Sequence, residues 1–345
     1  MISIRSLLLA GAIIAQSTFT FAADAPAVVA SIKPVHSLVS AVMAGVGAPA
    51  LIVQGGGSPH TYALKPSEAR ALQQADVVFW IGPALEAFLE RPVETLGTDA
   101  TIVTLGDSDG LTKLAFREGG PFEAHDHEKA EHHHGEAAQE EGHGHGGEHV
   151  HTDEKEHAHG DGEVREHGHG HGGTDMHLWL DPENAKVMAG RIAAALAAAD
   201  PDHAATYAAN AEALQARLDA LKAEIADELA PVRDRPFVVF HDAYRYFENR
   251  FGVTAVGSIT VSPEAAPGAQ RLRDIHDKIG RLGAACVFAE PQFEPKLIAV
   301  VTEGTDARAG VLDPLGAELA DGPDLYFELI RAMATSLKQC LGEPG

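Results

Sequence analysis

Short apolar runs alternate with helix-like segments along most of the chain, and the alternation occurs twice. The strand-like runs of the first half lie at residues 28–32, 50–53, 77–81 and 101–105, and the helix-like segments at 36–44, 66–74 and 85–95. The strand-like runs of the second half lie at 237–240, 254–259, 286–289 and 309–312, and the helix-like segments at 244–251, 268–282, 295–304 and 324–341. Alternation of this kind predicts parallel sheets covered by helices.

A long segment rich in Ala, Leu and Glu separates the two halves. Its apolar residues keep helical spacing from Tyr207 to Leu229, after Pro201 and before Pro231. A helix over 201–230 would extend roughly 40 Å, which is too long for a routine crossover. We therefore predict an α/β fold of two lobes, each with a roughly four-stranded parallel sheet flanked by helices, joined by this one long helix. Ligands bind at the carboxyl ends of such strands, so we expect the site in the cleft between the lobes.

The predicted domain organisation follows from these segments. We expect a signal peptide at 1–22, an N-terminal α/β lobe at 23–200, a connecting helix at 201–230 and a C-terminal α/β lobe at 231–345. The first residues carry one positive charge, at Arg5, then an apolar run too short to cross a membrane. Small residues then indicate cleavage near Ala22/Ala23, and no cysteine follows that would indicate a lipid anchor. This pattern predicts export to a periplasm.

Residues 123–173 depart furthest from ordinary composition and form a His-rich, acidic tract inside the first lobe. They hold 14 of the 20 histidines among glycines and acids, a composition that cannot bury a core. Closely spaced neutral imidazoles suit zinc, copper, nickel and iron, so we expect a weak, multi-ion site rather than an inert spacer. Its histidines are His125, His127, His132, His133, His134, His143, His145, His149, His151, His157, His159, His167, His169 and His171.

Charge and cysteine content narrow the function classes. The net charge of −24 argues against nucleic acid as a partner. The chain has two cysteines, Cys286 and Cys340, and an even number in an exported protein favours one disulfide between them. A disulfide would remove both as metal ligands.

Six histidines lie outside the tract, and three of them occupy positions expected in a cleft. His60 lies in the loop after the second strand, His177 follows the tract, and His241 ends a strand. His203 and His276 lie in charged helical surroundings and His36 at a turn, where a structural role is expected. Three imidazoles from separate segments fit a zinc site, and Asp313, at another strand end, could complete a tetrahedron.

Several separated motifs then give a specific resemblance. They are IKPVHSL at 32–38, SPHTYALKPS at 58–67, MHLWLDP at 176–182, FHDAYRYF at 240–247, PGAQRL at 267–272 and FAEPQF at 288–293. Together with the His-rich loop, they resemble the zinc-binding solute receptors of bacterial ABC importers, the ZnuA type. The resemblance covers essentially the whole mature chain.

The resemblance implies two α/β lobes joined by a rigid helix, with Zn²⁺ in the cleft. It implies His60, His177 and His241 as ligands, whereas the fourth position is Asp313 or a water. Close relatives carry an acid before the first ligand, but this chain has Pro59. The implied partners are a membrane permease with its cytoplasmic ATPase, and the chain is expected to be a monomer; periplasmic zinc chaperones stay open as further partners.

Three alternatives remain beside this interpretation. A zinc enzyme is disfavoured because the His-Glu-x-x-His motif and its inverse are absent. A periplasmic zinc buffer or chaperone that acts mainly through the tract would not need two lobes and a cleft. Manganese as the cognate metal would favour more carboxylate than this chain offers, and copper(I) would favour Met and Cys.

Overall fold

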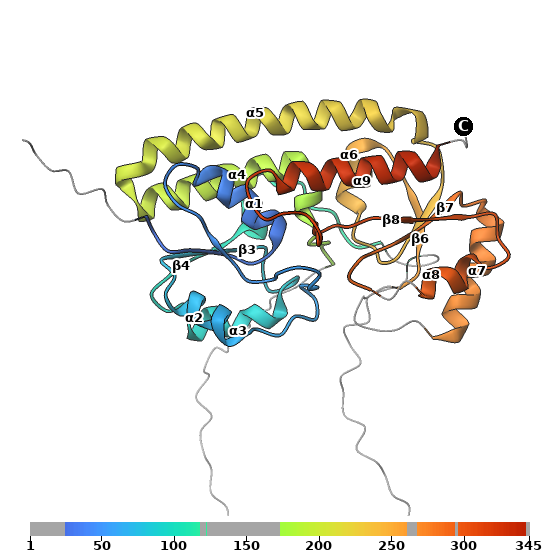
Figure 1. The fold of residues 1–345 in the computed structure, drawn as a ribbon, viewed down its shortest axis with the longest axis horizontal. Coiled ribbons are helices and arrows are strands. Elements are labelled where there is room, and N and C mark those ends of the chain that lie inside the picture. The colour runs from blue at the N-terminus through green and yellow to red at the C-terminus, as the bar shows by residue number, and fades with distance from the viewer. Residues whose placement is uncertain (1–24, 118–121, 123–172, 261–267, 294–295, 343–345) are drawn as a thin grey trace, which may run out of the picture.

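Two parallel four-stranded sheets lie side by side beneath one long helix (Figure 1). The computed structural model describes residues 25–117, 122, 173–260, 268–293 and 296–342. The predicted signal peptide and the tract, apart from Gly173, lie outside these described residues. No helix among the described residues is long and apolar enough to cross a membrane.

The N-terminal sheet has the strand order β2-β1-β3-β4, with every pair parallel. Its strands are β1 (Val28–Ala30), β2 (Ala50–Leu51), β3 (Val77–Trp80) and β4 (Thr101–Thr104). Its helices are α1 (Lys33–Val42), α2 (Pro66–Gln73), α3 (Ala87–Thr95) and, beyond the tract, α4 (Pro182–Ala199). In Figure 1, α2 and α3 lie below this sheet, and α1 and α4 lie above it.

The C-terminal sheet repeats the arrangement in the order β6-β5-β7-β8. Its strands are β5 (Phe237–Val239), β6 (Ala255–Ser258), β7 (Cys286–Ala289) and β8 (Arg308–Val311). Its helices are α6 (Arg245–Phe251), α7 (Ala269–Leu282), α8 (Lys296–Thr302) and α9 (Leu325–Leu341). The predicted fold class, two α/β lobes with parallel four-stranded sheets, is confirmed.

Helix α5 (Ala204–Leu229) runs the length of both lobes (Figure 1). Its buried positions follow one stripe at helical spacing, because every third or fourth residue of a helix returns to the same face. They are Tyr207, Ala211, Leu214, Leu218, Leu221, Ile225 and Leu229. The chain enters and leaves α5 through short 3-10 turns at Pro201–His203 and Ala230–Val232.

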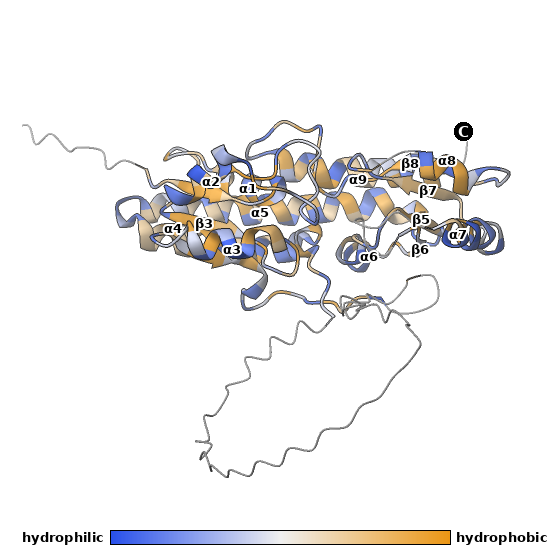
Figure 2. Cartoon of the chain, turned by 90° about the horizontal axis from the view of Figure 1, so that it is seen from below, coloured by the Kyte–Doolittle hydropathy of each residue, from blue (hydrophilic) through white to orange (hydrophobic). Residues whose placement is uncertain are grey.

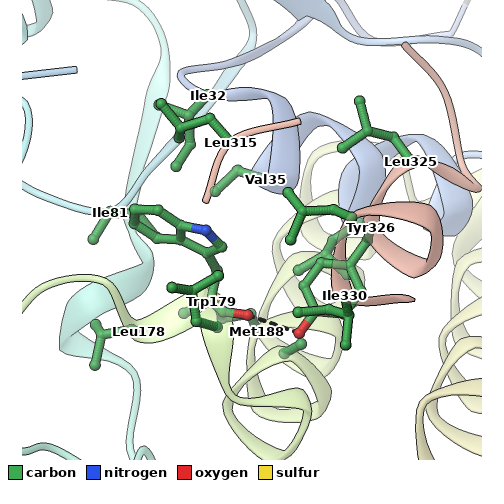
Figure 3. Close-up of a cluster of buried hydrophobic side chains, with 14 of the residues drawn as sticks. Ile32, Val35, Ile81, Leu178, Trp179, Met188, Leu315, Leu325, Tyr326 and Ile330 are labelled. Carbon is green, nitrogen blue, oxygen red and sulfur yellow. Dashed lines mark hydrogen bonds between the residues drawn. The ribbon is translucent and has the colours of Figure 1, made fainter. Parts of the chain in front are cut away.

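The main hydrophobic core is continuous from one lobe to the other. Helix α9 belongs to the C-terminal lobe by sequence, yet it packs against α5 and also against α1 of the N-terminal lobe. Figure 3 shows the junction, where Tyr326 and Ile330 of α9 approach Trp179 and Met188. The Tyr326 hydroxyl donates a 2.7 Å hydrogen bond to the Trp179 carbonyl oxygen. The lobes therefore share an interior as well as a connecting helix.

A second, smaller core lies on the other face of the C-terminal sheet, beneath α7 and α8. Helix α7 is largely hydrophilic on its outer side, whereas the strands are apolar (Figure 2). A disulfide joins Cys286 on β7 to Cys340 on α9, across 54 positions of sequence. The disulfide therefore links α9, which packs on both lobes, to the C-terminal sheet.

Candidate metal centre

Three histidines from separate segments meet between the lobes. His60 lies in the loop between β2 and α2, His177 immediately precedes a 3-10 turn at Leu178–Leu180, and His241 lies two residues after the end of β5. His177 and His241 are buried, and His60 is half-buried. Two rings thus come from the N-terminal lobe and one from the C-terminal lobe.

Two of the three nitrogen–nitrogen spacings between these rings match a tetrahedral metal site. The Nε2 atom of His177 lies 3.4 Å from the Nε2 atoms of both His60 and His241, and one nitrogen from each ring lies within 4.8 Å of the others. Zinc–nitrogen bonds of about 2.0–2.1 Å in a tetrahedron place neighbouring nitrogens about 3.3–3.4 Å apart. One ion can therefore reach all three rings with little rearrangement.

Two carboxylates set the orientation of the buried rings. The Nδ1–H of His177 donates to Oδ1 of Asp175 at 2.7 Å, and the Nδ1–H of His241 donates to Oε1 of Glu290 at 2.6 Å. Asp175 is 1 % exposed and Glu290 is 3 % exposed, so bulk water screens the charge of neither carboxylate. Because a carboxylate only accepts hydrogen bonds, the proton of each neutral ring is held at Nδ1 and the lone pair at Nε2.

This arrangement brings imidazole lone pairs together. The Nε2 lone pairs of neutral His177 and His241 face each other across 3.4 Å, which is repulsive unless a cation or a proton lies between them. Burial lowers the pKa of His241, but the charge and hydrogen bond of Glu290 outweigh it and raise the pKa above its usual value. The site is electrostatically suited to a positive charge.

A small pocket surrounds the three rings. The pocket has about 10 Å³ of free space. The indole ring of Trp179 lies 5.3 Å from the ring of His177, and the phenyl ring of Phe293 lies 6.0 Å from the ring of His241. The lining residues are Ser58, Pro59, His60, His177, Trp179, His241, Glu290, Gln292, Phe293, Pro314 and Leu315.

The carboxylate of Asp313 is not brought into the histidine cluster. It accepts hydrogen bonds from the backbone N–H groups of Leu315 at 3.0 Å, Gly316 at 2.9 Å and Ala317 at 2.6 Å. The side-chain amide of Gln292 donates a further bond at 2.9 Å. Asp313 thus organises the turn that places Pro314 and Leu315 in the pocket wall, a role that its strand-end position did not predict.

The other described histidines lie outside the cluster. His36 is buried, and its Nε2 lies 3.1 Å from the carbonyl oxygen of Pro49, a structural contact within the N-terminal lobe. Burial lowers the pKa of this ring below its usual value. The ring of His203 pairs with Asp200 at the start of α5, and His276 lies exposed on α7. The histidines of the tract lie outside the described residues.

A buried ion-pair network joins the lobes next to the site. The guanidinium of Arg117 pairs with the carboxylates of Asp242, which follows His241, and of Glu248 on α6. The Nη1 and Nη2 atoms of Arg117 each lie 2.8 Å from an oxygen of Glu248. Just before Arg117, Ala115 forms an antiparallel bridge with Thr174, which leads directly into Asp175 and His177. The described segments on either side of the tract, at Ala115 and Thr174, therefore lie together beside the cluster.

Sequence reasoning proposed the three histidines but did not assign roles to Asp175 and Glu290. Both lay inside or beside quoted motifs, at Asp175-Met-His177 and in FAEPQF. The position of Glu290 directly after a predicted strand could have indicated that it lies near His241, because the ends of neighbouring parallel strands meet at one sheet edge. The contact with His241 itself depends on the order of β5 and β7 in the sheet.

Comparison with known proteins gives one consistent family. A family model described as "Zinc-uptake complex component A periplasmic" (ZnuA) matches residues 28–340. The chain is 58% identical over 342 residues to the high-affinity zinc uptake system protein ZnuA of Brucella suis, with 99% of each chain covered. It is 41% identical over 353 residues to the protein of the same name from Paracoccus denitrificans, again with 99% of each covered.

Solved structures of similar fold include metal-bound proteins. A zinc-bound deletion mutant of ZnuA has a TM-score of 0.69 at 23% identity, covering 93% of this chain and 100% of the other. A manganese-bound periplasmic metal-binding protein from Candidatus Liberibacter asiaticus has a TM-score of 0.66 at 18% identity, covering 91% and 98%. At these identities the likeness concerns the fold.

Proposed function

The chain belongs to the ZnuA family of periplasmic zinc-uptake components, and we propose that His60, His177 and His241 are the residues with which it captures Zn²⁺. Its function is that of a high-affinity zinc receptor that delivers the ion for uptake through an ABC importer. The observation that supports the ligand assignment is the close approach of the Nε2 atoms, since that of His177 lies 3.4 Å from those of both His60 and His241. In addition, Asp175 and Glu290 accept hydrogen bonds from the Nδ1–H groups of His177 and His241.

The donor set supports zinc over manganese. Three imidazoles form a borderline-soft, neutral set, whereas manganese favours more carboxylate and a larger coordination number. Asp175 and Glu290 bind the rings and not the pocket centre, so they supply charge at a distance without adding hard ligands. Some proteins of this fold hold manganese or cadmium, and the imidazole set is what favours zinc in this chain.

Zinc binding by single histidine variants tests the assignment. We expect His241→Ala to lose the tight ion, because two imidazoles and a cavity replace a three-nitrogen site. The measurement is competition with a chromophoric chelator at less than one equivalent of zinc, in the full-length protein. His276→Ala is the matched control, because this ring is exposed on α7 and should leave affinity unchanged. Full zinc affinity in His241→Ala would refute the ligand set.

We further propose that the protein acts in the periplasm after removal of a signal peptide near Ala22/Ala23. Its expected partners are the permease and ATPase of the importer, in keeping with the family. The protein is expected to work as a monomer, and periplasmic zinc chaperones stay open as further partners. Because the family consists of solute receptors, we assign the site a binding role and no catalysis. Mass spectrometry of the exported protein would identify the mature N-terminus.

The tract is proposed as a secondary, weaker zinc site. Its 14 imidazoles would bind extra ions, each at the cost of ordering glycine-rich backbone. Deleting residues 123–171 should leave one tight ion per protein while removing the extra stoichiometry, measured by calorimetry. Gly173 is kept because its carbonyl oxygen accepts a hydrogen bond from Phe116 in the paired ends. If the deletion abolished tight binding, the tract and not the cluster would be the primary site.

A further inference from the structure

Gln292 lies in the wall of the metal pocket, two residues beyond Glu290. Its amide nitrogen donates to Oδ1 of Asp313 at 2.9 Å. Its amide oxygen is buried and has no hydrogen-bond partner among the described residues. A buried acceptor without a partner is unfavourable and uncommon in folded proteins, so this oxygen calls for a donor that enters the pocket.

Asp313 determines which end of the Gln292 amide faces that pocket. A carboxylate only accepts hydrogen bonds, so the NH₂ group of Gln292 must face Asp313 and its oxygen must point away. The carboxylate cannot turn aside, because three backbone N–H groups, those of Leu315, Gly316 and Ala317, also donate to it. The orientation of Gln292 is therefore fixed before any ion arrives.

The ion leaves one coordination position that the three imidazoles do not fill. In a tetrahedral site the fourth position takes a protein ligand or a water. Pro59 precedes His60 and offers no carboxylate, and the carboxylate of Asp313 is committed to its turn. A metal-bound water is a strong hydrogen-bond donor, and two buried acceptors without a partner belong to residues that line this pocket, the amide oxygen of Gln292 and Oε2 of Glu290. The other oxygen of Glu290 already accepts from His241, so the carboxylate is oriented toward that ring, whereas the amide oxygen of Gln292 has no such commitment.

We propose that Gln292 holds the fourth ligand of the ion, a water, through its amide oxygen, and that Asp313 acts only by positioning Gln292. This inference rests on the proposed zinc site. A neutral amide stabilises bound water without adding a charge or a hard ligand to the site. The imidazole set then keeps its preference for zinc, and the exchangeable water leaves one position from which the ion can be transferred.

Affinity measurements on matched variants test the proposal. Gln292→Leu removes the acceptor at similar size, and Gln270→Leu is the control because Gln270 lies exposed on α7, bonded to Asp274. In full-length protein at less than one equivalent of zinc, we expect Gln292→Leu to bind roughly 10-fold more weakly, as for other residues that support a ligand. Gln270→Leu should match the wild type.

A spectroscopic measurement on the wild type does not depend on how the variant folds. Cobalt(II) at half an equivalent, in ¹⁷O-enriched water, should show electron–nuclear coupling to one bound water oxygen. Absence of that coupling would overturn the proposal, because the fourth ligand would then be a protein group. In Gln292→Leu we expect the coupling to change, since the water loses its acceptor; an unchanged coupling with unchanged affinity would overturn it as well.

Measuring the zinc affinity of His241→Ala beside that of Gln292→Leu distinguishes failure of the proposed zinc site from failure of the proposed role of Gln292. If His241→Ala loses tight zinc and Gln292→Leu does not, the zinc site stands and the role of Gln292 is refuted. If neither variant loses affinity, the site assignment fails and the role of Gln292 fails with it. Loss in both, together with the cobalt coupling to water in the wild type, is the expected result.

Discussion

Single hydrogen bonds determine which nitrogen of each buried imidazole is free to bind an ion. Asp175 and Glu290 each accept a hydrogen bond from the Nδ1–H group of one buried imidazole, which leaves both Nε2 lone pairs directed into the pocket. Such carboxylate–imidazole pairs fix ring orientation and raise the basicity of the ligand. In the proposed site the histidines bind the ion, and the two carboxylates balance its charge.

Glu290 also makes zinc compete with a proton. Burial lowers the pKa of His241, but the charge and hydrogen bond of Glu290 raise it above the usual 6.5, so the ion-free ring keeps its proton to higher pH than an ordinary imidazole. In the ion-free protein this pair stabilises the fold fully below a pH of about 6.5, and the contribution disappears as the pH rises through the raised pKa. Zinc binding must release that proton.

We therefore predict that Glu290→Gln releases fewer protons per zinc at pH 7, because the lowering of the His241 pKa by burial is then opposed only by the smaller effects of Asp242 and Asp175. The same variant should lose roughly 10-fold in zinc affinity. Calorimetry at half an equivalent of zinc, in buffers that differ in ionisation enthalpy, counts the protons. Glu224→Gln, which alters an exposed pair with Arg331, is the control. Equal proton release in Glu290→Gln and the wild type would contradict this prediction.

At the residue scale, the sequence allowed the three histidines to be proposed as ligands but not the carboxylates that hold two of their rings. His60, His177 and His241 could be proposed because they follow strands or the tract and match family motifs. Asp313 was proposed for the fourth position because it ends a strand, but its carboxylate is taken by N–H groups of the turn that follows. Asp313-Pro-Leu-Gly316 has the composition of such a turn, which was the available indication. The contact between Gln292 and Asp313 requires the folded sheet.

Among the elements, α9 contacts both lobes. It packs on α1 of one lobe, on α5, and through Cys340 on β7 of the other lobe. Sequence reasoning expected one connecting helix, and α5 agrees with that expectation. That α9 also spans both lobes could not be read from its pattern, because an amphipathic stripe identifies the buried face of a helix but not its neighbours.

The disulfide is expected to stabilise the C-terminal lobe without shaping the metal centre. Replacing Cys286 and Cys340 by Ser opens a cross-link across 54 positions, with an expected loss on the order of 4 kcal/mol in the free energy of unfolding. Chemical denaturation of the oxidised, reduced and double-Ser proteins measures this. Zinc affinity should be equal in all three. Identical denaturation midpoints would show that the cross-link does not stabilise the fold.

Arg117 is expected to stabilise the contact between the lobes. Arg117→Ala would leave the carboxylates of Asp242 and Glu248 buried without their cation, at a cost of about 3–5 kcal/mol in unfolding free energy. Arg117→Lys should recover little of this unfolding free energy, because one ammonium group cannot reproduce the paired contacts of a guanidinium with two carboxylates.

Urea denaturation measures this loss. The comparison variant is Arg331→Ala, whose partner Glu224 is exposed, so its cost should stay within about 1 kcal/mol. Equal costs for the two arginines would contradict the prediction.

At the scale of the whole molecule, the shared core restricts relative movement of the lobes. Lys33 of α1 donates to the carbonyl oxygens of Ala317 and Leu319 in the other lobe, and the Trp179 indole donates to that of Pro314 at 2.8 Å. Opening the cleft by domain rotation would break these contacts and expose the core around Tyr326 (Figure 3). His60, on a half-buried loop, can move without such losses.

We predict that the distance between the lobes is the same with and without zinc. Spin labels at Glu94→Cys on α3 and Asp277→Cys on α7, both exposed, report this distance by pulsed electron resonance. One unchanged distance distribution is expected, because binding-linked motion is confined to loops. A shift on zinc addition would show a hinge. The same measurement with labels in the His60 loop should change.

The contact between Trp179 and His177 gives the protein a built-in optical probe. The chain has two tryptophans, and the indole of Trp179 is fully buried, with its ring 5.3 Å from that of His177. Trp80 is bonded to Thr104 on the neighbouring strand and serves as a background emitter. A divalent cation that binds Nε2 of His177 changes the electric field at the indole, because Trp179 lines the same pocket. Emission of Trp179 can therefore follow capture and release of the ion in real time, without any attached dye.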